Sequence, residues 1–443
     1  MDHLSNEQEP QLHRLGFHYF LDAERYHAND AKLWFGKLNQ LSANWLVLKN
    51  PAGRAIPEDF IRQAAKQDIR VIIDFNKTMN DFEGLSEIET LLRVYGKWGV
   101  KYACLFSEPN LRKNWGDTQW VNVDIVAKHA DLFLEFSKTC VENKIQPIFS
   151  HLHPGGDYPD LAFLEQSLRL IQTKADPIIL KKLIISAYGW HHHHPLDWGA
   201  GGKKMWPNAN LFDRQSAEQD HHGFRLFEWY SEISEKMLGK KLPIILFEAG
   251  FAGRGMEVKQ GDNDDWAPNL DAVLGLLSGR NVFDHINPDH LLAPISQEVI
   301  ACCTYILSAQ ADQDLFPYRW FTANGEPLAP ARSYLPSRDT VHTHHHVLSA
   351  NLDGNESHQY QRYIFIDRSL QSEMPTILEK LDPYIKKHRP IIGFSLLEGS
   401  KSAYLIVITQ DRQQFLENNA NLIPQGILTK IIEYQKINEL LGE

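Results

Sequence analysis

Two glutamates stand directly after strongly apolar runs of the sequence. Glu108 follows a run that ends in Cys-Leu-Phe-Ser, and Glu248 follows Ile-Ile-Leu-Phe. A carboxylate in such a place is costly to bury unless it has a partner or a task. Two carboxylates that face each other across a cleft can protonate a leaving oxygen and attack an anomeric carbon or activate water. The pattern therefore points to glycoside hydrolysis, provided that the fold brings both glutamates to one face.

Short apolar runs alternate with longer amphipathic stretches over residues 15–330. Near-continuous apolar runs are typical of a parallel sheet covered by helices. Eight strand–helix units in about 310 residues favour an α/β fold of the (β/α)8 TIM barrel type over a doubly wound sheet. The predicted strands are Leu15–Asp22, Asn44–Asn50, Ile69–Asn76, Val100–Ser107, Ile145–Ser150, Lys182–Ala187, Leu242–Glu248 and Leu315–Phe321. The clearest predicted helices are Pro57–Lys66, Ile88–Trp98, Ile125–Asn143, Leu161–Thr173, Phe224–Leu238 and Ser296–Ala309, whereas residues 24–42 have only a poor helical pattern.

A barrel of this kind gathers the carboxyl ends of its strands at one face, where active sites lie. Glu108 would follow strand four and Glu248 would end strand seven, so both would reach that face. Two long connections, Tyr188–His222 and Gly250–Ile295, follow predicted strands six and seven. Long connections inside a compact domain usually carry function, so we expect them to form a lid or a binding rim.

The motif Ser-Glu-Pro-Asn at residues 107–110, with Glu248 at the end of strand seven, resembles glycoside hydrolase clan A. That clan contains retaining (β/α)8 enzymes, families 5 and 39 among them. The resemblance covers residues 15–330, and it implies a hydrolase of O-glycosidic bonds with Glu108 as general acid/base and Glu248 as nucleophile. Retention requires the two carboxyl groups to lie about 5–5.5 Å apart. The acid also needs a raised pKa, to which a neighbouring carboxylate contributes.

One position departs from the pattern of the clan. The clan usually has Asn immediately before the acid/base, where it binds the sugar 2-hydroxyl, whereas this chain has Ser107. A serine side chain is shorter and donates one proton. The contact at the 2-position must therefore differ, or another residue must make it. Asn110, two residues after Glu108, is a candidate for that contact.

Further residues near the expected barrel mouth are candidates for sugar contacts. By the same resemblance, Tyr188 would hydrogen-bond the nucleophile, with His191 behind it, and Trp320 would form the floor of the central subsite. Indole rings pack well against the C–H bonds of a sugar face, so Trp190 and other loop tryptophans are also candidates. The remaining candidates for hydroxyl contacts are His18, Tyr19, Asp74, Asn76, His151 and His153.

Three other interpretations stay open. The two glutamates could be salt-bridged scaffold residues. The chain could also be a non-catalytic carbohydrate-binding or regulatory protein on a retired barrel, which Ser107 and a second domain would suit. Metal-dependent chemistry at the run His191–His194 is the third. Contiguous histidines alternate in direction and no HExxH motif accompanies them, so we expect no metal and no cofactor.

The composition limits the partners and the compartment. With 45 basic and 56 acidic residues among 443, the net charge is −11, which argues against nucleic acid or an anionic membrane as the main partner. No run of about 18 apolar residues predicts a membrane span. The chain starts without a basic or apolar leader, and its four cysteines match no disulfide framework, so we expect a cytoplasmic protein with reduced thiols. Eleven tryptophans suit either a large core or ligand stacking, and their places in loops favour stacking on a sugar.

The C-terminal part is predicted to form a small α/β domain of its own. Residues 331–356 are polar and break the barrel pattern, so we interpret them as a linker between the barrel, residues 1–330, and a domain over residues 357–443. Its predicted elements are the strand Tyr363–Asp367, the helix Met374–Lys387, the strands Ile391–Ser395 and Tyr404–Thr409, and then helical segments. No motif indicates its role. The sugar, its linkage and the oligomeric state stay open as well.

Overall fold

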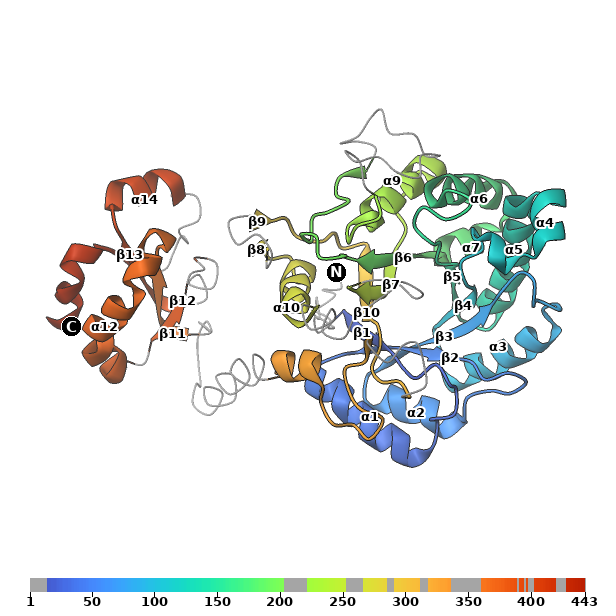
Figure 1. Ribbon diagram of the computed structural model, residues 1–443, viewed down its shortest axis with the longest axis horizontal. Helices are drawn as coiled ribbons and strands as arrows, with labels where there is room; N and C mark the ends of the chain where they lie inside the picture. The colour runs from blue at the N-terminus through green and yellow to red at the C-terminus, as the bar shows by residue number, and fades with distance from the viewer. Residues whose placement is uncertain are drawn as a thin grey trace, which may run out of the picture. The chain divides into compact units, whose positions relative to one another are not determined.

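The chain folds into two compact units, residues 1–345 and residues 346–443, in the computed structural model shown in Figure 1. The structure describes residues 14–202, 221–251, 266–284, 291–310, 318–335, 360–388, 390–393, 396, 402–419 and 428–442. Each unit has its own sheet and its own hydrophobic core. Among the described residues, no helix has both the length and the apolar character needed to cross a membrane.

The first unit is a closed barrel of parallel strands, in the order β1-β10-β7-β6-β5-β4-β3-β2 within the described part of the chain. This confirms the predicted (β/α)8 TIM barrel. The barrel strands are β1 (Leu15–His18), β2 (Trp45–Lys49), β3 (Arg70–Lys77), β4 (Tyr102–Phe106), β5 (Gln146–Phe149), β6 (Ile184–Trp190), β7 (Ile244–Gly250) and β10 (Val299–Thr304). A short antiparallel pair, β8 (Val282–Phe283) and β9 (Leu291–Leu292), lies between β7 and β10 in the sequence.

Helices surround the barrel, as Figure 1 shows. They are α1 (Ala28–Leu41), α2 (Glu58–Lys66), α3 (Ser86–Trp98), α4 (Asp117–Asn122), α5 (Ile125–Glu142), α6 (Asp160–Lys174), α7 (Pro177–Lys182), α9 (Leu226–Leu238) and α10 (Trp266–Leu277), together with the 3-10 turn η1 (Arg112–Asn114). Local signals set several ends: Asp124 caps α5 by accepting a hydrogen bond from the Ala127 amide. Gly99, with φ of +93°, ends α3 in the left-handed region that favours glycine.

Alternation along the strands divides the barrel core into two layers. On β2, Trp45 and Val47 belong to the cluster inside the barrel, whereas Leu46 and Leu48 pack in the larger cluster with the surrounding helices. Successive side chains of a strand point to opposite faces, so one apolar run supplies both layers. Each fully buried aliphatic or aromatic side chain contributes about 1.5–3 kcal/mol to folding through its removal from water.

The eighth barrel strand differs from its prediction. It is β10, Val299–Thr304, which lies inside the stretch Ser296–Ala309 that the sequence pattern assigns to a helix. Residues 315–317 of the predicted strand lie outside the described residues, and residues 318–321 form no strand beyond an isolated bridge at Phe321. The error has a physical cause: a short run that is apolar throughout carries no period that separates a buried strand from a buried helix.

Three further differences concern the connections and the second unit. The connection Gly250–Ile295 contains the helix α10, which no pattern in the sequence predicted. Residues 331–335 of the expected linker are helical, and the rest of the linker lies outside the described residues. In the second unit, the final helical segments that we predicted include a strand, β14 (Leu428–Glu433).

The second unit is an α/β domain with a parallel sheet in the order β12-β11-β13-β14. Its other elements are β11 (Tyr360–Ile366), β12 (Ile391–Gly393), β13 (Ser402–Thr409), α12 (Met374–His388), α14 (Arg412–Asn419) and the 3-10 segments η4 (Arg368–Glu373) and η6 (Tyr434–Gly442). Ile364 and Ile406 pack with Leu381 of α12 on one face, while Phe365 and Phe415 pack on the other. Both faces of the sheet are thus covered, as a parallel sheet requires.

Candidate active site

The backbone at Glu108 is fixed by its neighbours on both sides. The Ser107 amide donates to the Lys77 carbonyl at 3.0 Å, and the Glu108 amide donates to the His151 carbonyl at 3.1 Å. These bonds extend the pairing of β4 with β3 and β5 beyond the last residue of the strand. Glu108 itself has φ of +45°, a left-handed conformation that costs a non-glycine residue about 1–3 kcal/mol. The surrounding contacts must therefore hold this residue in place.

Three side chains of the following loop supply those contacts. The Asn114 amide donates to the carbonyls of Ser107 and Glu108, at 3.2 and 2.9 Å. The Trp115 indole donates to the Pro109 carbonyl at 2.6 Å. Asn110 is fully buried; its amide group donates to two backbone carbonyls at 2.7 and 3.1 Å and accepts from the His153 amide at 2.8 Å. Asn110 therefore shapes the loop, whereas the sequence suggested a sugar contact.

The Glu108 carboxylate has partners from three elements. Oε1 lies 3.0 Å from Nδ1 of His153 and accepts a hydrogen bond from the Tyr188 hydroxyl at 3.2 Å. Oε2 lies 3.7 Å from Nζ of Lys113. The Glu108 side chain is 14% exposed and that of Lys113 is 71% exposed, so the lysine contributes little. The histidine and the tyrosine are the strong partners.

These partners keep Glu108 ionised. Burial alone would raise the pKa of Glu108, but the hydrogen bond and charge of His153, together with the charges of His151 and Lys113, lower it to about 2. A carboxylate that accepts hydrogen bonds beside cationic groups is stabilised in its charged form. The sequence-based expectation for a general acid was the opposite, a raised pKa.

A bulge in β7 decides where Glu248 points. Ala187 of β6 pairs with Leu246, and the next residue, Tyr188, pairs with Glu248, so β7 has one residue more than β6 at this point. The pairing of β7 with β10 shifts at the same place. Leu246 packs with the outer helices and Phe247 with the barrel interior. Without the extra residue, alternation would turn Glu248 outward; the bulge instead places it on the interior face with Tyr188.

Glu248 is 1% exposed at this bulge. His18 helps to hold the bulge, because its Nε2 lies 2.6 Å from the Phe247 carbonyl oxygen. A carbonyl can only accept, so Nε2 of His18 is the donor. The His18 ring also meets the Phe247 ring edge-on, with centroids 5.0 Å apart. This gives His18, a predicted sugar contact, a role beside the candidate nucleophile.

Tyr188 and Trp190 form a stack on the mouth side of β6. Their ring centroids are 4.0 Å apart with planes 17° apart. Trp190 also meets His153 edge-on at 5.8 Å. Trp190 is buried, and its Nε1 has no hydrogen-bond partner among the described residues. Trp190 thus packs against both Tyr188 and His153, the two residues that hydrogen-bond the Glu108 carboxylate.

His191, the next residue, is fully buried and stacks on Trp266 at 5.5 Å. Burial, with the neighbouring histidines His193 and His192, lowers the pKa of His191 to about 3. The ring is therefore neutral at ordinary pH and packs as an aromatic side chain.

Ser107 and Asn76 lie near the site in different settings. The Ser107 hydroxyl is 3.0 Å from Nε2 of His151, whose ring stacks on Phe247 at 4.4 Å. Asn76 has φ of +45° at a point where β3 has an extra residue against β4, and its amide donates to Asp74. Ser107 thus connects the Glu108 turn to the β7 bulge through His151.

Most tryptophans that the structure describes lie in the core. Trp320, the expected subsite floor, is fully buried against Phe17 and Tyr334, and it lies well beyond the end of the true eighth strand. Trp115 is also fully buried. Trp98, Trp120 and Trp198 are half-buried, and Trp206 lies outside the described residues. A large core, rather than sugar stacking, accounts for most of these indoles.

Two residues that matter here were missed in the sequence. Lys113 and Asn114 contact Glu108 through η1, a short turn without a periodic pattern that could have indicated them. In the described part of the chain, no three His, Cys, Asp or Glu side chains are grouped as a metal site.

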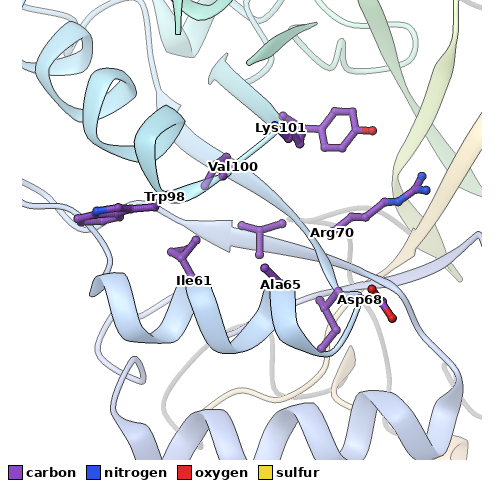
Figure 2. A pocket seen from close by; sticks show the side chains of 11 residues that line it. Ile61, Ala65, Asp68, Arg70, Trp98, Val100 and Lys101 are labelled. Carbon is purple, nitrogen blue, oxygen red and sulfur yellow. The ribbon is translucent and has the colours of Figure 1, made fainter. Parts of the chain in front are cut away.

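A hollow of about 270 Å3 lies elsewhere, where β3 and β4 begin. Figure 2 shows Ile61 and Ala65 of α2 on one side, with Trp98 and Val100 on another and Arg70 beside them. The amino ends of barrel strands lie opposite the face that carries Glu108 and Glu248. This hollow is therefore not part of the candidate site.

A scan of the sequence against protein-family models finds no match, and neither does a search of curated protein sequences. Solved structures of glycosidases are similar to this chain at low sequence identity. A monomeric β-xylosidase from Caulobacter crescentus CB15 is 10% identical, with a TM-score of 0.44 over 74% of this chain and 68% of that chain. A GH39 enzyme from Xanthomonas axonopodis pv. citri is 9% identical, with a TM-score of 0.42 over 74% and 66%. A triple mutant of the endo-β-1,4-glucanase from the same organism is 8% identical, with a TM-score of 0.40 over 73% and 98%.

Proposed function

We propose that this protein is a retaining glycoside hydrolase that cleaves an O-glycosidic bond, with Glu248 as nucleophile and Glu108 as acid/base. The observation that carries the proposal is the position of the two glutamates. Glu108 follows β4 and Glu248 lies in the last part of β7, and Tyr188 of β6 is in register with Glu248 and hydrogen-bonded to Glu108. Glycoside hydrolysis requires a pair of carboxyl groups, one as acid/base and one as nucleophile.

The reaction would run in two steps. In the first, a Glu248 oxygen bonds to the anomeric carbon while the bond to the leaving oxygen breaks and that oxygen takes a proton from Glu108. In the second, water loses a proton to Glu108 and its oxygen displaces Glu248 from the same carbon. A nucleophile that is 1% exposed is shielded from bulk water, which strengthens its electrostatic interaction with the developing positive charge on the sugar.

The test begins with a panel of 4-nitrophenyl glycosides, which also identifies the sugar. Glu248→Ala should abolish turnover of the best substrate, and added azide should restore part of it by forming a glycosyl azide of inverted configuration. Glu108→Ala with azide should give the retained configuration instead. Turnover that survives in Glu248→Ala would overturn the proposal.

A non-catalytic carbohydrate-binding protein is the second candidate. The observation that favours it is the contact of Glu108 with His153 and Lys113, which holds the carboxylate as an anion. Such a protein would bind an oligosaccharide in calorimetry, and neither the wild type nor any variant would turn over an aryl glycoside.

A further inference from the structure

One oxygen of Glu108 serves two donors that pack against a common ring. Oε1 lies 3.0 Å from Nδ1 of His153 and 3.2 Å from the Tyr188 hydroxyl. Trp190 stacks on Tyr188 and meets His153 edge-on. His153 is 30% exposed, so one side of its ring reaches solvent while Nδ1 reaches the carboxylate. Packing, rather than a mobile surface ion pair, holds this histidine in place.

We propose that Glu108 and His153 act as one acid pair that shares a single proton, so that His153 sets the pH range in which the acid/base of the hydrolase is competent. The catalytic meaning of the pair rests on the proposed function above. His153 acts through Glu108 and is therefore a positioning residue, whereas Glu108 is the group that would touch the substrate.

The electrostatics of the site explain why such a pair is needed. A carboxyl with a pKa of about 2 has no proton to give at neutral pH, and so cannot act as an acid by itself. An imidazole in direct contact can hold the proton that the carboxylate lacks. The other titratable groups that act on or bond Glu108 are His151, Lys113 and Tyr188. Of the imidazoles near Glu108, His153 is the one whose ring nitrogen is within hydrogen-bond distance of the carboxylate among the contacts found in the described residues.

The number of protons is conserved through both steps of the reaction. Before the reaction the pair holds one proton, between Nδ1 of His153 and the Glu108 carboxyl. As the glycosidic C–O bond breaks, the carboxyl passes that proton to the leaving oxygen, and the pair remains as neutral imidazole and carboxylate. When water attacks the glycosyl–Glu248 ester, the proton that the water loses returns to the pair. Titration of such a pair yields apparent pKa values that belong to both groups together.

The first experiment measures kcat/KM against pH with the aryl glycoside that the panel selects. His153→Asn keeps an amide donor near the position of Nδ1 but removes its titration. We expect the alkaline limb to move to lower pH by about one unit or more. We also expect kcat/KM to fall about 100-fold for a poor leaving group, but far less for 2,4-dinitrophenolate, which needs no proton. His194→Gln, at an exposed histidine that stacks on Trp198, is the matched control and should leave the profile unchanged.

A merely structural role would give another pattern. Loss of packing would lower kcat/KM by the same factor for all leaving groups and leave the alkaline limb in place. That result in His153→Asn would overturn the shared proton while leaving the proposed hydrolase intact.

A second experiment needs no turnover. The stabilities of Glu108→Gln, His153→Asn and the double variant form a double-mutant cycle, measured by urea unfolding at pH 5.5 and pH 9. All eleven tryptophans lie between residues 34 and 320, so their fluorescence reports the barrel unit alone. We expect strong coupling at pH 5.5 and much weaker coupling at pH 9, because a charged imidazole binds a carboxylate more strongly than a neutral one. Equal coupling at both pH values would contradict the shared proton. If the coupling depends on pH but azide restores no turnover in the glutamate variants, only the proposed hydrolase would be rejected.

Discussion

The hydroxyl of Tyr188 donates a hydrogen bond to Glu108 across 3.2 Å, while the Tyr188 backbone lies in register with Glu248. Tyr188 on β6 therefore bonds one carboxylate through its side chain and is paired with the residue of the other through its backbone. The resemblance to clan A implied that Tyr188 would bond the nucleophile, whereas the bond found here goes from its hydroxyl to the candidate acid/base. The consequence is that Tyr188 contributes to the ionisation and orientation of Glu108.

Tyr188→Phe should weaken catalysis without unfolding the barrel. The variant keeps the ring that stacks on Trp190 and loses one hydrogen bond to a charged group, worth about 1.5–3 kcal/mol. We expect kcat/KM for the selected aryl glycoside to fall about 10- to 100-fold. Tyr158→Phe is the control, because the Tyr158 hydroxyl accepts a hydrogen bond from Gln166 on α6. An equal loss of activity in the two variants would contradict the role of Tyr188.

Glu108→Gln should destabilise the barrel at neutral pH, which is unusual for a residue in an active site. The folded-state pKa of about 2 lies below the ordinary value of 4.5, so ionised Glu108 stabilises the fold above pH 4.5. That stability is lost as the pH falls toward 2. The difference between the two pKa values corresponds to at most about 3 kcal/mol in the free energy of unfolding. Urea unfolding at pH 7 should show that Glu108→Gln is less stable than the wild type. The difference between their free energies of unfolding should become smaller as the pH falls from 4.5 to 2. A variant as stable as the wild type at pH 7 would refute the ionised, hydrogen-bonded state.

Asn110→Ala tests whether this residue shapes the loop. The side chain is fully buried and bonds three backbone groups, so its removal leaves buried polar groups unsatisfied. We expect a loss of about 2–3 kcal/mol in the free energy of unfolding. Asn39→Ala, at an exposed position of α1, should change it by less than about 0.5 kcal/mol. Unchanged stability with weaker substrate binding would instead support the sugar contact that the sequence suggested.

Trp320→Ala tests whether Trp320 is a core residue or the floor of a sugar subsite. The indole is fully buried and meets the rings of Phe17 and Tyr334, so its loss leaves a large cavity. We expect the barrel to lose about 3–5 kcal/mol of stability. Trp198→Ala, which removes a half-buried indole in the loop after β6, should cost less. A stable Trp320→Ala protein with a raised KM would restore the subsite interpretation.

The order of the first seven barrel strands could be read from the sequence because each combines a short apolar run with a flanking amphipathic helix. Their observed ends differ from the predicted ones by a few residues. The eighth strand could not be recognised, since Val299–Thr304 continues into further apolar residues and has no alternation of its own. The helix α10 was missed for a similar reason: its residues are almost all buried, so no polar face gives it a helical period.

The sequence by itself determined which carboxylates lie near the carboxyl ends of strands four and seven, because a long apolar run sets the place of a strand to within a few residues. Only the tertiary structure decided how those carboxylates are used. The bulge at Phe247 turns Glu248 inward, and a one-residue change of register is invisible in a sequence of apolar residues. His153 and Lys113 reach Glu108 from separate loops. The pKa of an acid depends on such neighbours in space, so the sequence predicted a raised value where the folded chain lowers it.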